Sequence, residues 1–200
     1  MNSLLKFSRL VDACSDLIGK VLFWFILAAV FISAGNAIVR KLFNMSSNAL
    51  LEIQWYLFSA VFLLGAGYAF LKNAHVRIDF ISNHLSPKTR NWIDIVGILV
   101  FLGPLCVILI KLSWPLFENA WVSGEMSQNA GGLIRWPVML LIPAGMTLLL
   151  MQAISELIKR FAFLRGAIPD PLGHGAESSP EDELAREIEE HARHADAEIR

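Results

Sequence analysis

The side chains that could carry out chemistry in this chain lie at the ends of its apolar runs or outside them. The 2 cysteines, Cys14 and Cys106, are far apart and form no C-x-x-C pair, which gives little support for a redox or metal site. His191 and His194 could share a helix face, but no thiol and no firm third ligand accompanies them. We therefore predict no catalytic, cofactor or metal site, and the chain is not expected to be an enzyme.

Three carboxylates, those of Glu52, Asp94 and Glu156, stand at the edges of apolar runs. A pump or secondary transporter usually places ionisable groups at membrane depth, where they bind a coupling ion or the substrate. A haem subunit would need histidines inside the runs, and an intramembrane protease would need a nucleophile and a base there. The pattern favours a membrane subunit that supports another protein. A stand-alone homo-oligomeric channel or exporter, or a membrane anchor of another complex, remains the alternative.

The elements that must position these groups are four apolar runs without Asp, Glu, Lys, Arg or His, namely Val21–Val39, Ile53–Leu71, Ile95–Ile110 and Trp136–Ser155. A spanning helix needs about 20 mostly apolar residues. The third run reaches that length when it extends to Trp92 and Phe117. With a chain that is 55% hydrophobic and 18% charged, the sequence predicts an all-α integral membrane protein with four transmembrane helices and short interfacial helices.

Lys and Arg gather before the first run, in the loop after the second run and after the fourth run. The positive-inside rule then places both termini in the cytoplasm. We expect residues 1–20 to form an amphipathic interfacial segment, although an extension of the first spanning helix is the alternative. Residues 21–165 are expected to form the four-helix membrane domain. Residues 166–200 are expected to form an acidic cytoplasmic tail that is disordered or weakly helical.

Small residues recur at helical spacing in the first two runs: Ala29, Ser33 and Ala37 in one, Gly65 and Ala69 in the other. Such stripes let helices approach closely, although they also occur by chance in leucine-rich helices.

The family resemblance is carried by five segments: Glu52–Leu57 (EIQWYL), Leu64–Ala69 (LGAGYA), His75–Asp79 (HVRID), Trp136–Pro137 and Pro143–Gly145. In this order the sequence resembles the small membrane subunit of tripartite ATP-independent periplasmic (TRAP) transporters. The resemblance covers roughly residues 17–163 and leaves the acidic tail outside. The segment Gly124–Leu133 is similar to a branch associated with uptake of 2-oxo acids or aromatic carboxylates, and the acid itself stays open.

The resemblance implies a small scaffold subunit of a sodium-coupled, binding-protein-dependent secondary transporter that imports organic acids. A large elevator-type permease subunit would carry the sodium and substrate sites, and a soluble periplasmic binding protein would deliver the substrate. The location implied is the bacterial inner membrane, with lipid as a further partner. No cofactor and no nucleic-acid partner is implied.

Structural or subunit-interface roles are expected for eight residues of the matching segments: Glu52, Tyr56, Gly65, His75, Arg77, Asp79, Pro143 and Gly145. For Glu52, one explanation is attraction to the helix N-terminus, and the other is a polar contact with the large subunit or a loop arginine. His75, Arg77 and Asp79 are expected to form a structural corner rather than to touch substrate. Pro143 predicts a kink in the fourth helix.

Five charged residues are expected to face the periplasm: Arg40, Lys41, Glu118, Glu125 and Arg135. They are candidates for contact with the binding protein, because complementary charge orients docking partners. For Arg40 and Lys41, anchoring to lipid headgroups explains the residues equally well. The glycine-rich loop between Glu118 and Arg135 is expected to be irregular.

Overall fold

The computed structural model of this chain describes residues 2–43, 47–73, 86–169 and 171. The elements in these residues are α1 (Asn2–Phe43), α2 (Asn48–Leu71), α4 (Pro87–Gly97), the π-helical η1 (Ile98–Leu102), α5 (Gly103–Ser123) and α6 (Trp136–Leu164). Within them, β structure is limited to one isolated bridge between Met126 and Ile134. Four helical stretches are long and apolar enough to cross a membrane, so the predicted all-α class with four spans is confirmed.

Helix α1 joins the N-terminal segment and the first apolar run in 42 residues without a break. At about 1.5 Å per residue it measures about 63 Å, roughly twice the thickness of a hydrocarbon core. Part of α1 must therefore lie outside the core, or the helix must tilt. The interfacial placement of residues 1–20 stays a prediction.

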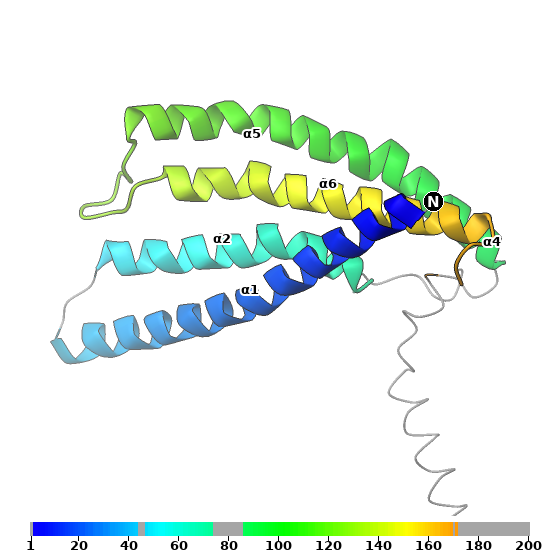
Figure 1. Ribbon diagram of the computed structural model, residues 1–200. Coiled ribbons are helices and arrows are strands. Elements are labelled where there is room, and N and C mark those ends of the chain that lie inside the picture. The colour runs from blue at the N-terminus through cyan, green and yellow to red at the C-terminus, as the bar shows by residue number, and fades with distance from the viewer. Residues whose placement is uncertain (1, 44–46, 74–85, 170, 172–200) are drawn as a thin grey trace, which may run out of the picture.

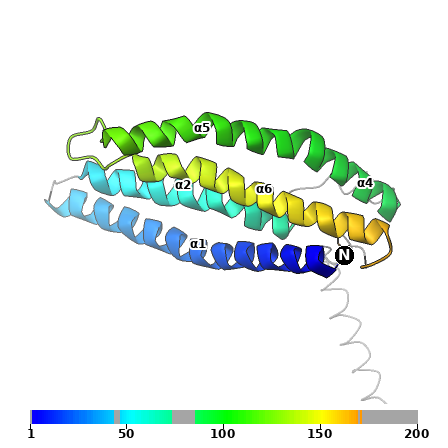
Figure 2. The same ribbon diagram turned by 45° about the horizontal axis from the view of Figure 1, so that its top comes forward.

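The long helices lie side by side in an open layer, in the order α5, α6, α2 and α1 (Figures 1 and 2). Helix α6 contacts α1, α2 and α5, while α2 contacts α1 and α6. The start of α1, α4 and the end of α6 share one end of the layer, called here the terminal end (Figure 1). The opposite end, called the loop end, holds the end of α1, the start of α2 and residues 124–135. An open layer leaves wide apolar faces for lipid or another subunit.

Helices α2 and α6 meet backbone to backbone at two glycines. A Cβ added to Gly145 would lie 2.5 Å from the carbonyl oxygen of Leu63, and one added to Gly67 would lie 3.6 Å from that of Leu148. Both glycines are buried. Helix α6 continues through Pro143, which is also buried and whose carbonyl accepts a 2.7 Å hydrogen bond from Thr147 Oγ1. The small residues in this region therefore allow close helix packing.

Helices α1 and α2 are close at the terminal end and separated at the loop end. A Cβ on Gly19 would meet the Tyr68 ring at 2.5 Å, and one on Gly65 would lie 3.4 Å from Leu22 Cδ1. Toward the loop end, Ser33 and Ala37 are exposed and line an open groove. Within the described chain these two residues pack closely against no other helix, because α1 inclines away from α2 there (Figure 1), and a contact of their stripe with another subunit stays a prediction.

Candidate functional site

A carboxylate on α2 ties the loop between α5 and α6 to the loop end of the layer. Glu52 Oε2 accepts a 2.7 Å hydrogen bond from the backbone N–H of Leu133. Its Oε1 accepts one from Asn129 Nδ2 at 2.8 Å and a short one from Ser127 Oγ. Both oxygens are thus used inside the chain. We call Glu52 and the loop groups that it binds the loop tether.

Two further α2 side chains bind the same loop. Asn48 Nδ2 donates to the carbonyl of Ala130 at 3.0 Å, and the Tyr56 hydroxyl donates to that of Ile134 at 3.0 Å. Asn48, Glu52 and Tyr56 are spaced four residues apart, which puts them on one face of α2. The start of α2 therefore binds the loop through three side chains of one helix face.

The loop has its own internal order. Its two arms are joined by 2.9 Å backbone hydrogen bonds, from Ser127 N–H to Leu133 O and from Arg135 N–H to Glu125 O, and the side chains of Glu125 and Arg135 form an ion pair. Gly132 is closely enclosed, since a Cβ there would lie 2.5 Å from Ser127 Cβ. The loop is therefore more regular than the sequence predicted.

The position of α2 decides between the two explanations offered for Glu52. The helix begins at Asn48, so Glu52 lies beyond its first turn and makes no helix cap. The capping explanation is therefore wrong. A loop contact is present, and its hydrogen bonds come from Ser127, Asn129 and Leu133. A contact of Glu52 with the large subunit stays a prediction.

A second polar cluster, here the terminal cluster, joins α1 to α6 at the other end through six side chains: Ser8, Asp12, Ser15, Gln152, Ser155 and Lys159. Asp12 Oδ1 accepts 2.8 Å bonds from Gln152 Nε2 and Ser155 Oγ, while Lys159 Nζ lies 3.1 Å from Asp12 Oδ2. Ser15 donates to Gln152 Oε1 at 2.7 Å, and the hydroxyls of Ser8 and Ser155 are 2.7 Å apart. Four of the six are fully buried: Ser8, Ser15, Gln152 and Ser155.

The terminal cluster continues from α6 to α4 through ion pairs. Glu156 pairs with both Lys159 and Arg160, and Arg160 Nη2 lies 3.0 Å from Asp94 Oδ2. Arg160 is 1% exposed and Glu156 3% exposed, and they are the buried charged residues of the described chain. Glu156, which the sequence places at the edge of an apolar run, is buried within the protein, and its charge is compensated by these two cations, as burial of an ion requires.

Sequence reasoning missed most of the terminal cluster, although a signal existed. Ser8, Asp12 and Ser15 are spaced by four and three residues, and the polar groups at 152, 155 and 159 by three and four. Each set marks one polar face of a helix. A single polar face does not say which helix it meets, so the pairing of α1 with α6 was not predictable from spacing alone.

The remaining predicted residues are placed as follows. Arg40 and Lys41 lie at the mouth of the α1–α2 groove, and Glu118 is exposed in the last turns of α5. His75, Arg77 and Asp79 lie outside the described residues, as does nearly all of the tail. Among the described residues, no three His, Cys, Asp or Glu side chains gather where they could hold a metal ion.

The fold and the two clusters define a class: a multi-pass membrane protein whose buried charges pair with one another across its own helices. A family model described as "Tripartite ATP-independent periplasmic transporters, DctQ component" matches residues 29–163. The match covers more than half of the chain, which therefore belongs to this family of small TRAP transporter subunits. No curated protein and no solved structure matches the chain.

Family membership confirms the resemblance read from the sequence. It identifies the chain as a component of a transporter rather than of an enzyme family, and supports a multi-pass protein of the inner membrane. It also implies association with a large permease and a periplasmic binding protein.

Proposed function

We propose that this chain is a scaffold subunit without its own transport path, in a sodium-coupled transporter that imports organic acids. The large permease subunit, an elevator-type protein, carries the sodium and substrate sites. A periplasmic binding protein delivers the acid. The small subunit widens the fixed part of the assembly, against which the permease moves.

The observation that carries this proposal is the pairing of the buried charges. Glu156 and Arg160 compensate each other, and their remaining partners are Lys159 and Asp94. Ionisable groups at membrane depth usually mark the path of an ion or a substrate. In the described part of this chain the two buried charged residues are instead engaged by protein groups. Carboxylates that already hold helices together are suited to a rigid support.

The proposal also assigns an orientation. Both termini face the cytoplasm, so the terminal end is cytoplasmic and the loop end is periplasmic, as the distribution of Lys and Arg predicts. The periplasmic end then presents Glu118 of α5, together with Glu125 and Arg135 of the ordered loop, to the binding protein. Arg40 and Lys41 lie at the same end, with lipid headgroups as their second candidate partner.

Glu52, Tyr56, Gly65, Pro143 and Gly145 support subunit assembly in this proposal by fixing the shape of the layer. Glu52 and Tyr56 fix the loop on α2, and the other three lie in helix packing regions. The proposal extends the same role to the corner formed by His75, Arg77 and Asp79.

The test is Glu52→Gln in the assembled transporter with its binding protein. The amide can no longer accept bonds on both side-chain atoms, so the loop tether weakens and uptake of carboxylate falls. The sodium concentration for half-maximal uptake stays unchanged, because no sodium ligand is touched. Asn119→Ala changes an exposed side chain at the same end that belongs neither to the loop tether nor to the proposed contact with the binding protein, and it serves as the control. A clear shift in sodium dependence in Glu52→Gln would contradict the scaffold assignment.

A further inference from the structure

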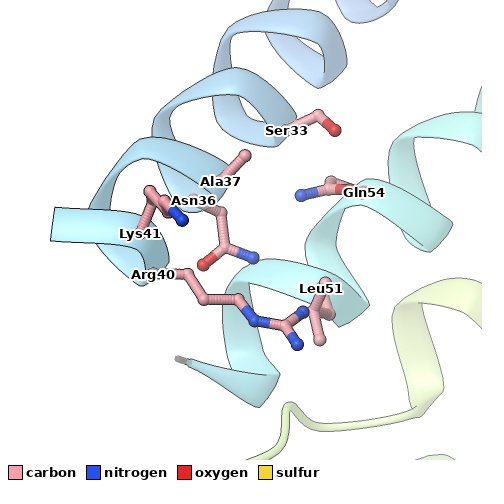
Figure 3. A pocket seen from close by; sticks show the side chains of 7 residues that line it. All are labelled: Ser33, Asn36, Ala37, Arg40, Lys41, Leu51 and Gln54. Carbon is pink, nitrogen blue, oxygen red and sulfur yellow. The ribbon is translucent and has the colours of Figure 1, made fainter. Parts of the chain in front are cut away.

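The groove between α1 and α2 has a polar mouth at the loop end. This part holds about 430 Å³ and is lined by Ser33, Asn36, Ala37, Arg40, Lys41, Leu51 and Gln54. Figure 3 shows Asn36 and Arg40 reaching from α1 toward α2, and Gln54 reaching back from α2. Among the described residues, no carboxylate lies within ion-pair distance of Arg40 or Lys41.

Asn36 gives this mouth the character of a binding site. Its side chain is 7% exposed, and its Oδ1 finds no hydrogen-bond partner in the described part of the chain. A buried amide oxygen without a donor is costly. A ligand in the groove that donates a hydrogen bond would remove that cost.

Below the mouth the groove becomes apolar. A second cavity of about 720 Å³ shares Ser33 and Gln54 with the mouth, and its other lining residues are Ile26, Ala29, Val30, Trp55, Phe58 and Val61. A third cavity of about 810 Å³ shares Ile26 and Val61 with the second and extends along the same two helices to Gly19 and Tyr68. The polar mouth therefore continues into a long apolar part of the same groove, which runs parallel to the axes of α1 and α2. This part is called the apolar channel below, and it is not a pore.

We propose that this groove binds one phospholipid with an anionic phosphodiester and a hydroxylated neutral headgroup, of the phosphatidylglycerol type. The phosphate lies between Arg40 and Lys41, a headgroup hydroxyl donates to Asn36 Oδ1, and an acyl chain fills the channel below. The groove is cationic at the helix end and apolar toward the middle of the helices. A phospholipid in a leaflet has the same arrangement, with its charged headgroup at the surface and its acyl chains toward the middle of the membrane. Two cationic side chains at the end of such a groove attract an anionic headgroup electrostatically.

The headgroup follows from the lining residues. No carboxylate of the described residues pairs with Arg40 or Lys41. These two cations therefore favour a ligand with a net negative charge over a zwitterionic one, whose own cation they would repel. Asn36 Oδ1 needs a donor, which a glycerol headgroup supplies without adding positive charge. Exposed small residues at Ser33 and Ala37 leave the space that the headgroup needs.

The test is native mass spectrometry of the full chain in detergent, with equal amounts of palmitoyl-oleoyl phosphatidylglycerol and the matching phosphatidylcholine. The wild-type chain should retain one phosphatidylglycerol with a preference of about tenfold, given that cations near the surface each favour anionic lipid. Arg40→Gln/Lys41→Gln should abolish the preference. Lys88→Gln/Lys111→Gln removes the same charge at exposed positions elsewhere and should keep it.

A second variant tests the apolar channel independently of charge. Ala29→Phe adds a ring inside the channel and should reduce retention of both lipids, while far-UV circular dichroism confirms an unchanged helix content. Absence of a preference in the wild-type chain, or its persistence in Arg40→Gln/Lys41→Gln, would overturn the proposal. A third result would also overturn the proposal: the lipid is lost when the large subunit assembles with this chain, and Ala29→Cys crosslinks to the large subunit. A permease helix would then occupy the groove.

Discussion

Replacing Gly145 with alanine would put a methyl group where the backbone of α2 lies. The new Cβ would stand 2.5 Å from the carbonyl oxygen of Leu63 and 2.8 Å from its carbonyl carbon. Because the clash is with backbone atoms, it is relieved only when α2 and α6 move apart. Such overpacking lowers the free energy of unfolding by about 1–3 kcal/mol. The higher helix propensity of alanine raises it by at most about 1 kcal/mol. We expect Gly145→Ala to lower the free energy of unfolding by about 1–2 kcal/mol.

Gly67→Ala is the matched control, since Gly67 is buried in the same helix pair. Its added Cβ would lie 3.6 Å from the nearest atom, the carbonyl oxygen of Leu148, which is an ordinary contact. This variant should be as stable as the wild type or gain up to about 1 kcal/mol. Unfolding by sodium dodecyl sulfate in mixed micelles, followed by far-UV circular dichroism, gives both free energies. Equal stability of the two variants would refute backbone contact between α2 and α6 at Gly145.

Three further substitutions test the two polar clusters. Glu156→Gln leaves the buried Arg160 without one of its carboxylates and should lower the free energy of unfolding by about 3 kcal/mol in the same titration. Asp12→Asn weakens the attraction to Lys159 and should cost about 1–3 kcal/mol, with proteolysis near the start of α1 becoming faster. Gly132→Ala would push a Cβ to 2.5 Å from a side chain of the loop tether, so residues 124–135 should become more sensitive to proteolysis while the helix content stays constant.

Controls for these substitutions come from exposed or open positions. Glu118→Gln removes an exposed carboxylate from α5 and should leave the unfolding free energy unchanged. Gly97→Ala adds a Cβ with no atom within 4 Å and should not sensitise the loop to proteolysis. A stable Glu156→Gln protein would contradict the structural role of the terminal cluster. An unaltered loop in Gly132→Ala would contradict the close packing of the loop tether.

Most of the fold was predictable because the hydrophobic signal is strong. Runs without charges specify spans directly, and the matching segments from Glu52 to Gly145 specify the family. The unbroken stretch from Pro87 to Ser123 was only partly foreseen. Pro104 has no N–H and cannot donate a helix hydrogen bond. In the π-helical turn just before it, the N–H of Gly103 donates to the carbonyl of Ile98, five residues back, in place of the usual acceptor four residues back. Sequence reasoning did not use that proline, although it is a visible cue for irregular helix.

The candidate sites were less predictable, because they depend on which faces meet. Glu52 was singled out, but its partners are loop atoms, including the backbone N–H of Leu133, and a sequence does not show such contacts. Asp12 and Lys159 lie outside the apolar runs, and their spacing does not show that they pair. Their pairing follows from the extension of α1 beyond the apolar run, so that its polar face lies along α6. The missing information was which helix the polar face of α1 meets.

The central claim is that this chain supports transport without performing it. Vesicles reconstituted with this chain alone, with a sodium gradient and carboxylate-loaded binding protein, test it most directly. The account predicts no accumulation of the acid, and recovery of uptake when the large subunit is included. Accumulation driven by the gradient in vesicles that hold only this chain would contradict it.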